Sequence, residues 1–384
     1  MKSKDWFEKH GPLFVERGLV RQTLRLGFAP GRGWRRMLAT LGVALGHLTL
    51  VAINRVGRTW DNWCHSDYRD VDLRAPVFII APPRSGTTMF HRLLCADPRF
   101  AYINLAHTLF PSVGLARLLG WLERSEMWVP RLFRRVLTSI EDSMLSGWDD
   151  IHFTRFFEAE EDEGLYFLTM ISPGLYLFVP EVEAISRVDT LDDWDQRTRR
   201  RVMSFYTSSL KRLMFVLGSN RVFLGKSVFL PGRIDSLMER FPDARFVHLV
   251  RSPYETIPSF ISMFIRPWRW HSPKIAENDA RSRALMNVVI EQYRRMATAR
   301  EALGPERLIT LRYKDVVRDP RAAVTSVYDW LGWQPDSGMD ARLSRHENKG
   351  YRSRHRYTLK QFGLSEKEVR DAMGDVFDAY DFAA

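Results

Sequence analysis

The sequence predicts a three-layer α/β/α fold built around a central, mostly parallel sheet. Four short apolar segments have the composition of strands buried on both faces, and helical patterns alternate with them along the chain. Strands separated by helices form parallel βαβ units. The strand segments are 77–80, 222–224, 246–250 and 308–311, and the helical patterns include 88–95, 196–217 and 285–303.

Length and composition allow one large enzyme domain with appendages. The chain has 384 residues, of which 45% are hydrophobic, and this is enough for a buried core. Residues 1–70 are expected to form a helical N-terminal extension, since the pattern changes at Pro76. We expect a main domain over residues 71–384. It contains a largely helical, aromatic-rich insertion at about 109–217 that would shape a pocket.

Cysteine usage and the N-terminus indicate where the protein works. Cys64 and Cys95 are too few for a disulfide framework or a zinc cluster, so we expect a reducing compartment and no metal. Residues 1–21 lack the hydrophobic block and the small-residue cleavage site of a secretory signal peptide. The chain is therefore expected in the cytoplasm.

The net charge of +11 suits an anionic small ligand, an anionic membrane surface or nucleic acid. No nucleic-acid-binding signature accompanies the charge, so a nucleic-acid partner is not expected. The segment 37–53 comes nearest to a membrane span, but its 17 residues are few and include His47. We expect a helix that packs on the domain or lies peripherally at the inner face of a membrane.

A turn suited to an anion follows the first strand. Residues 82–88 (PPRSGTT) connect that strand to a helix with one apolar face. Amides at a helix N-terminus have no partner within the helix, and the helix dipole favours an anion there. An isolated Ser-Gly-Thr-Thr is usually only an N-capped turn, but its strand-to-helix setting favours binding. The candidate ligands of a phosphate or sulfate are Arg84, Ser85, Gly86, Thr87 and Thr88.

This turn is not a Walker A loop, which would need a lysine where Thr87 stands. PPRSGTT, followed by a helix that contains Leu93 and Leu94, resembles a segment of the sulfotransferases that use 3′-phosphoadenosine 5′-phosphosulfate (PAPS). In that family the basic-Ser-Gly-Thr-Thr segment cradles the 5′-phosphosulfate. The resemblance therefore implies that PAPS is the donor.

A second anion-binding element follows another buried strand. The strand at 246–250 ends in Arg251, and Ser259 lies in the helical pattern that follows. An arginine at a strand end and a serine on the next helix can converge on one phosphate. Alone, Arg251 would be interpreted as a solvated arginine. However, FVHLVRSPYETIPSF resembles the sulfotransferase segment that holds the 3′-phosphate of PAPS.

Resemblance to the sulfotransferases covers most of the chain from Pro76 onward. Lys226 resembles the family's lysine beside the transferring sulfuryl group, where a cation stabilises charge on the bridging oxygen. The alternative for Lys226 is a surface lysine. Tyr313, with Lys314 and Asp315, resembles the family's Tyr-Glu-Asp segment, and we interpret it as structural.

A basic segment near the C-terminus resembles the loop that closes over the 3′-phosphate in sulfotransferases. The resemblance assigns Lys349, Gly350 and Arg352 to donor binding. The alternative is a solvated basic face.

The resemblance implies a P-loop nucleotide-binding-like fold with PAPS across the carboxyl ends of the strands. A hydroxyl or amine of an unidentified carbohydrate, lipid or other small molecule would attack sulfur, with no metal required. Two alternatives stay open: a P-loop-type small-molecule kinase and a catalytically inactive nucleotide-binding protein of the same fold. The missing Walker lysine counts against the kinase.

The catalytic base does not carry over from better-known sulfotransferases. Their histidine would stand at Val228, and residues 100–111 offer no carboxylate, which leaves His107 as the candidate there. The acidic run 158–163 stands beside aromatic residues, so we expect some of its carboxylates in a partly apolar cleft that raises their pKa. The alternative is a solvated acidic turn. We expect the base to be Glu161, then Glu163, then His107; the two glutamates should project in different directions.

Overall fold

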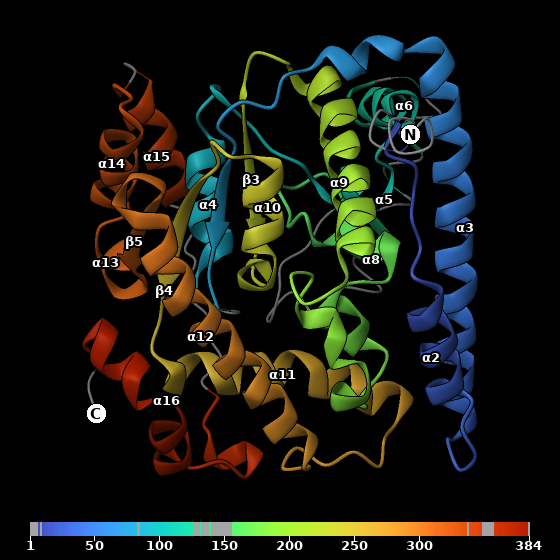
Figure 1. Ribbon diagram of the computed structural model, residues 1–384, viewed down its shortest axis with the longest axis vertical. Helices are drawn as coiled ribbons and strands as arrows, with labels where there is room; N and C mark the ends of the chain where they lie inside the picture. Colours follow the sequence, from blue (N-terminus) through green and yellow to red (C-terminus); the bar gives the residue numbers. More distant parts are fainter. Residues whose placement is uncertain are drawn as a thin grey trace.

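A computed structural model provides the fold (Figure 1). It describes residues 7, 10–82, 85–125, 127, 131–132, 135, 138–139, 156–335, 338–347 and 357–382, with the side chains of 340 and 345–347 left out.

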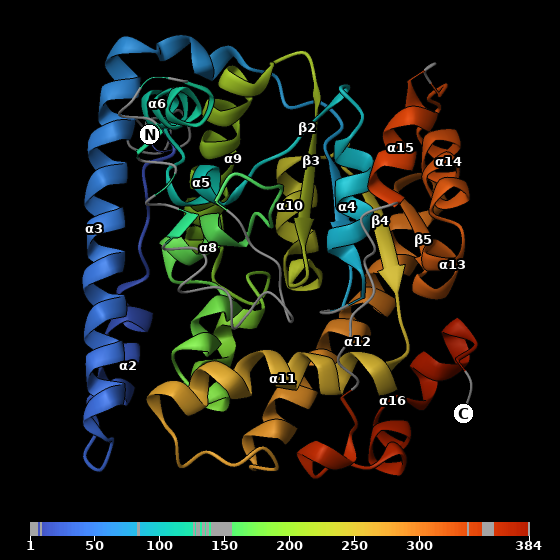
Figure 2. The same cartoon turned by 180° about the vertical axis from the view of Figure 1, so that it is seen from behind.

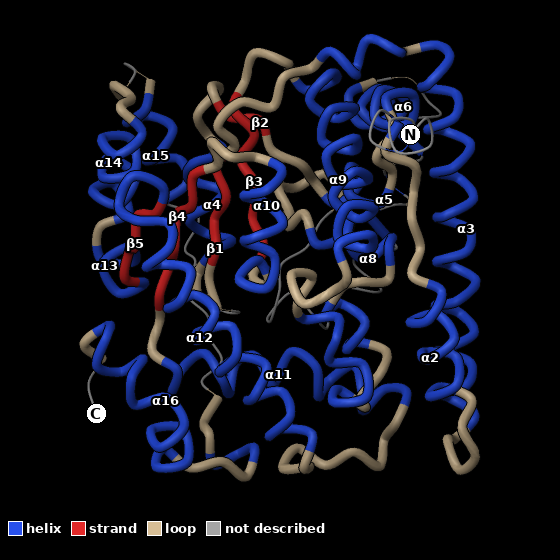
Figure 3. The backbone as a smooth tube through the Cα atoms, in the orientation of Figure 1, coloured by secondary structure: helices blue, strands red, loops and turns tan. Residues whose placement is uncertain are grey.

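The centre of the fold is a five-stranded parallel sheet with the strand order β2-β3-β1-β4-β5 (Figure 3). The strands are β1 (Val77–Ile80), β2 (Phe100–Ala101), β3 (Val222–Ser227), β4 (Arg245–Val250) and β5 (Leu308–Arg312). The four predicted strands are confirmed. The sequence missed β2 because two residues are too few to form a recognisable pattern.

Fourteen α-helices in the described part of the chain surround the sheet. They are α2 (Arg17–Gly27), α3 (Trp34–Cys64), α4 (Thr87–Cys95), α5 (Leu105–Leu109), α6 (Val113–Arg124), α8 (Glu163–Thr169), α9 (Gln196–Leu217), α10 (Ile234–Arg240), α11 (Pro253–His271), α12 (Arg281–Arg307), α13 (Tyr313–Arg318), α14 (Pro320–Leu331), α15 (Met339–Glu347) and α16 (Glu366–Tyr380). Short 3₁₀ helices are η1 (Ser66–Asp70), η2 (Pro173–Leu177), η3 (Val182–Asp189), η4 (Leu230–Arg233) and η5 (Lys360–Phe362).

The alternation of side chains along β1 separates the two faces of the sheet. Val77 and Ile79 belong to a buried cluster that includes residues of α4, α14 and α15. Phe78 and Ile80 belong to a second cluster, to which α9, α10, α11 and α12 contribute. Helices therefore cover both faces, which confirms the predicted three-layer fold (Figures 1 and 2).

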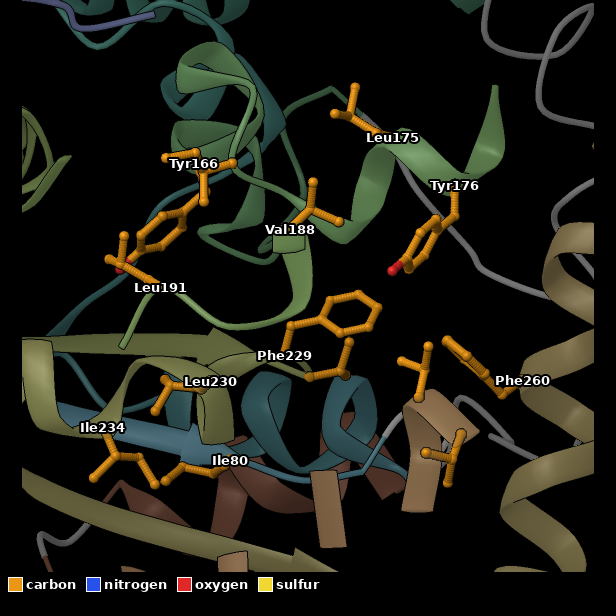
Figure 4. Packing of buried hydrophobic residues seen from close by; sticks show 14 of the residues in the cluster. Ile80, Tyr166, Leu175, Tyr176, Val188, Leu191, Phe229, Leu230, Ile234 and Phe260 are labelled. Atoms are coloured by element: carbon orange, nitrogen blue, oxygen red, sulfur yellow. The ribbon is translucent and has the colours of Figure 1, made fainter. Parts of the chain in front are cut away.

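The second cluster extends beyond the sheet into the segment between α6 and α9. Figure 4 shows Tyr166 of α8 and Leu175 and Tyr176 of η2 in this cluster, together with Ile80 of β1 and Phe260 of α11. The described parts of the predicted insertion thus contain helical turns that pack beside the carboxyl ends of the strands.

The helix expected at 37–53 is longer than predicted, because α3 has 31 residues. The arginines that flank the apolar segment do not end it: Arg36 and Arg58 are buried and continue the helix. Among the described residues, α3 is the one helix long and apolar enough to cross a membrane, judged by length and composition. It lies along one edge of the molecule, and α13 and α14 lie at the opposite edge (Figures 1 and 2).

Candidate active site

The register of two neighbouring strands brings Lys226 to the first anion turn. Ile79 of β1 pairs with Lys226 of β3, so the lysine lies at the carboxyl ends of the strands, where β1 leads into α4. The Lys226 side chain is fully buried, and its Nζ donates to Oγ1 of Thr88 over 3.2 Å. The lysine predicted to stand beside the sulfuryl group therefore contacts the second residue of α4.

The described part of the turn has the features of an anion cradle, and Arg84 lies outside the described residues. Ser85 is fully buried, and its Oγ has no hydrogen-bond partner within the described part of the chain. Gly86 has a φ of 77°, and a Cβ there would lie 2.3 Å from the ring of Tyr313. Thr87 and Thr88 begin α4, where helix amides lack intrahelical acceptors. An unsatisfied hydroxyl beside such amides fits a phosphate or sulfate oxygen.

The second anion element is positioned by the next pair of strands. Val250 of β4 pairs with Arg312 of β5, so Arg251 and Tyr313 leave the sheet side by side. The Arg251 guanidinium lies 4.4 Å from the centre of the Tyr313 ring, and its Nε donates to Oε2 of Glu255 over 2.8 Å. Ser259 lies on α11 and is half-buried.

Tyr313, interpreted as structural from the sequence, lies between the two anion elements. Its ring closes on Gly86 of the first element and stacks on Arg251 of the second. The signal that could have found it is its place directly after a strand, at the same sheet edge as both elements.

Two carboxylates of the acidic run lie beside Lys226. The Nζ of Lys226 is 3.3 Å from Oε1 of Glu161 and 3.7 Å from Oε1 of Glu160. The backbone holds this segment in place: the amide of Glu160 donates to the carbonyl of Ile103, and the amide of Asp162 donates to the carbonyl of Lys226. The sequence ranking omitted Glu160, although it stands in the acidic run.

Glu163 binds a different cation. Its two oxygens accept from the buried Arg233 over 2.6 and 2.9 Å, and Ser172 Oγ donates to it over 2.6 Å. The guanidinium of Arg233 stacks on the ring of Tyr166 at 3.7 Å. Glu161 and Glu163 thus face different partners, as their spacing predicted, although Glu161 precedes α8 instead of lying within it.

Asp162 lies between these two glutamates and is buried. Burial raises its pKa to about 7, against the opposing effect of the hydrogen bond that the Tyr206 hydroxyl donates to it. Its carboxyl therefore changes charge near neutral pH.

Two histidines near the site, the half-buried His107 and the buried His91, are neutral. His107 belongs to the cap of α5, where Asn104 accepts from its backbone amide and its Nδ1 accepts from the amide of Asn104. Burial lowers the pKa of His107 to about 4. His91 on α4 was not predicted; burial, and next the charge of Lys226, lower its pKa to about 3.

Lys349, Gly350 and Arg352 lie outside the described residues, as does Arg84. Within the described part of the chain, no group of three or more His, Cys, Asp or Glu side chains is arranged to hold a metal ion.

Fold and site together place a buried lysine and two carboxylates where parallel strands run into helices, beside a turn with an unsatisfied hydroxyl. Residues 76–337 match the sulfotransferase family. The chain belongs to this family and is a sulfotransferase.

Comparison with individual proteins agrees with the family. The chain is 25% identical, over 315 residues, to the omega-hydroxy-beta-dihydromenaquinone-9 sulfotransferase Stf3 of Mycobacterium bovis and of Mycobacterium tuberculosis, covering 80% of this chain and 75% of Stf3. Its fold is similar to sulfotransferase STF9 of Mycobacterium avium, with a TM-score of 0.77 and 18% identity over 99% of this chain and 96% of STF9. Sulfotransferase STF1 of Mycobacterium tuberculosis gives a TM-score of 0.72 with 18% identity, over 93% and 91% of the two chains. These neighbours confirm the P-loop-like sulfotransferase fold.

Proposed function

We propose that the protein transfers the sulfuryl group of PAPS to a hydroxyl or amine of a small, lipid-like acceptor. The observation that carries this proposal is the position of Lys226. It is buried between the Thr88 hydroxyl and two carboxylates, at the mouth of a turn whose Ser85 hydroxyl lacks a partner within the described residues.

The donor would bind through both anion elements. Ser85, Gly86, Thr87 and Thr88, together with Arg84, would hold the 5′-phosphosulfate at the start of α4. Arg251 and Ser259 would hold the 3′-phosphate, with Tyr313 joining the two elements. Lys349, Gly350 and Arg352 would close over that phosphate.

The reaction would need one cation and one base. An acceptor oxygen or nitrogen forms a bond to sulfur, the bond between sulfur and the bridging phosphate oxygen breaks, and adenosine 3′,5′-bisphosphate leaves. Lys226 would stabilise the charge on that oxygen. Glu161 would take the acceptor's proton, because its carboxylate lies nearest to Lys226. Glu163 and His107 rank behind it, since Arg233 and the cap of α5 engage them.

Two observations support a lipid-like acceptor. The relative Stf3 is a sulfotransferase of a hydroxylated dihydromenaquinone, and 80% of this chain aligns with it. The segment beside the site is rich in aromatic residues such as Phe156, Phe157 and Phe167. We further propose that the enzyme works in the cytoplasm at the inner face of a membrane, and that residues 1–70 form an extension to a sulfotransferase domain over residues 71–384.

Calorimetry with adenosine 3′,5′-bisphosphate tests the donor. Arg251→Ala and Thr88→Ala should each weaken binding by about 1.5–3 kcal/mol, because each removes a hydrogen bond to a charged phosphate. Arg84→Ala should act in the same direction. Arg269→Ala is the matched control, since this arginine also lies on α11 but pairs with Glu277 on the surface. Unchanged affinity in a folded Arg251→Ala protein would overturn the donor assignment.

Turnover with ³⁵S-labelled PAPS and an omega-hydroxylated quinol tests the reaction. Labelled product supports the proposed function. Bisphosphate binding without any transfer, for every hydroxylated or amino acceptor tried, would favour the inactive binding protein. Binding of ATP in preference to bisphosphate would favour the kinase.

A further inference from the structure

The longest helix of the molecule is inverted relative to an ordinary surface helix, since its polar side faces the protein. Arg36 pairs with Glu181, and Asp61 pairs with Arg212 at 3.1 Å. Three more polar side chains of α3 are buried and bonded to the domain. They are His47, whose Nε2 lies 3.1 Å from the Leu168 carbonyl, Asn54, which donates to the Leu109 carbonyl over 2.7 Å, and Arg58, which donates to Ser209 Oγ over 2.9 Å.

The opposite side of α3 is apolar and exposed. We call it the outer face; its large apolar members are Trp34, Met37, Leu38, Leu41, Leu45, Leu48, Ile53, Val56, Trp60 and Trp63. Val56 is 72% exposed and Trp63 is 78% exposed, and only 17% of the most apolar 18-residue window is buried. Between Met37 and Ile53, a length of about 24 Å, the helix carries no Asp, Glu, Lys or Arg.

Such a face needs a partner, because monomeric soluble proteins rarely expose continuous apolar patches of this extent. A membrane crossing by α3 does not fit the structure. It would separate Arg36, Arg58 and Asp61 from partners that belong to the folded domain. The occupant must therefore lie against the outer face and leave the inner contacts in place.

The charges around the outer face indicate an anionic lipid surface. Exposed Arg35 and Arg55 flank its uncharged middle. The neighbouring helix α2, whose Gly27 contacts Thr40 of α3, exposes Arg17, Arg21 and Arg25 at four-residue intervals, on the side opposite its buried residues. Tryptophans at both ends of an apolar helix face, with arginines beside it, are typical of helices that lie in the headgroup region of a bilayer. The net charge of +11 has the matching sign.

We propose that the outer face of α3 docks the enzyme on the surface of an anionic bilayer, with the helix lying in the plane of the membrane. This deepens the proposed function and rests on its lipid-like acceptor. One short helix connects the inner side of α3 to the active site: α8 begins at Glu163, two residues after Glu161, and near its other end the Leu168 carbonyl contacts His47 of α3. Since α8 has seven residues, the inner side of α3 lies on the order of 10 Å from the active site along it, and the outer face lies about one helix diameter, roughly 10 Å, further out. A lipid-like acceptor anchored in the bilayer would thus extend roughly 20 Å from the outer face to reach Lys226.

Cosedimentation of the full chain with vesicles tests the docking. The wild type should bind vesicles of equal parts phosphatidylglycerol and phosphatidylcholine, and bind vesicles of phosphatidylcholine alone more weakly. Leu38→Glu/Leu45→Glu/Leu48→Glu should lower the partition coefficient by about tenfold or more, because charges then face the acyl region. Val56→Glu is a milder second variant in case the triple variant does not fold. Val317→Glu is the matched control, since Val317 is also an exposed valine but belongs to α13 at the opposite edge of the molecule.

The docking proposal would be overturned if the wild type did not bind anionic vesicles. It would also be overturned if Leu38→Glu/Leu45→Glu/Leu48→Glu and Val56→Glu both bound vesicles as strongly as the wild type, or if Val317→Glu lost as much vesicle binding as these variants. A lipid-free dimer in light scattering that Val56→Glu dissociates would instead assign the face to a second copy of the chain. Bisphosphate affinity is measured on the same proteins and should stay at the wild-type value. Vesicle binding without bisphosphate binding would reject the proposed function and leave the docking intact, and the reverse result would reject only the docking.

Discussion

Two buried cations stand near the same acidic segment, and the structure pairs them differently. Arg233 makes two short hydrogen bonds to Glu163 and stacks on Tyr166, and Ser172 donates to the same Glu163 carboxylate. Lys226 has longer contacts, at 3.3 and 3.7 Å, to Glu161 and Glu160, and borders the turn with the unsatisfied Ser85 hydroxyl. The first pair is bidentate and short, and we expect it to hold the fold. We expect the second, with its longer contacts, to rearrange around a ligand.

The largest effect is expected from breaking the pair of Arg233 and Glu163. Arg233→Met should lower the free energy of unfolding by about 3–5 kcal/mol, because Glu163 would keep a mostly buried charge without its partner. Urea denaturation measures this. The double variant Arg233→Met/Glu163→Gln should recover much of the loss, since no uncompensated charge remains. A loss below about 1 kcal/mol in the single variant would show that this pair is not structural.

Removing Lys226, the cation with the longer contacts, should affect catalysis most. Lys226→Met should reduce sulfuryl transfer by about 10²–10³-fold, because the leaving oxygen loses its cation. Single-turnover kinetics with saturating PAPS measures the step. Lys274→Met, at an exposed lysine in the loop after α11, is the control and should transfer normally. Transfer at the wild-type rate in Lys226→Met would show that Lys226 does not stabilise the leaving oxygen.

Substitutions of Glu161 and Glu163 should affect different measurements. Glu161→Gln should lose transfer by about 10²-fold and keep its affinity for bisphosphate, because it lacks only the group that accepts the proton. Glu163→Gln should mainly lose stability, through its contacts with Arg233. His107→Ala completes the set. Full transfer in all three variants would show that the base lies elsewhere.

The last effect depends on pH and concerns Asp162, which lies between the two pairs. Its folded pKa of about 7 lies above the unfolded value of about 3.9, so the folded state keeps this proton to higher pH. The group's contribution to stability is therefore present below pH 4 and is lost as the pH rises towards 7. Urea midpoints of the wild type should fall more steeply over this window than those of Asp162→Asn. Parallel pH profiles of the two proteins would contradict the raised pKa.

Local sequence was sufficient for four of the five strands and for locating the two turns that we propose to bind anions. The strands before Arg84 and Arg251 are short apolar runs, and the helix after Gly86 begins with hydroxyl residues, so a few adjacent residues carry each pattern. Resemblance to the sulfotransferases assigned Lys226 from one such pattern. The two-residue strand β2 left no comparable signal.

Only the tertiary structure decided which groups meet. The pairing of Ile79 with Lys226, and of Val250 with Arg312, set Thr88 against the lysine and Tyr313 against Arg251. Glu161 and Glu163 have different partners because Lys226 and Arg233, both distant in the sequence, lie beside different carboxylates.

The orientation of α3 likewise depends on partners far along the chain. Its sequence contains both an apolar side and a polar side, and by periodicity alone the apolar side would be expected to face the core. Asp61 turns inward because Arg212 lies there, and Arg36 turns inward because Glu181 does. Periodicity is a local property of the helix, whereas the side that becomes buried follows from charges that only the folded chain brings together.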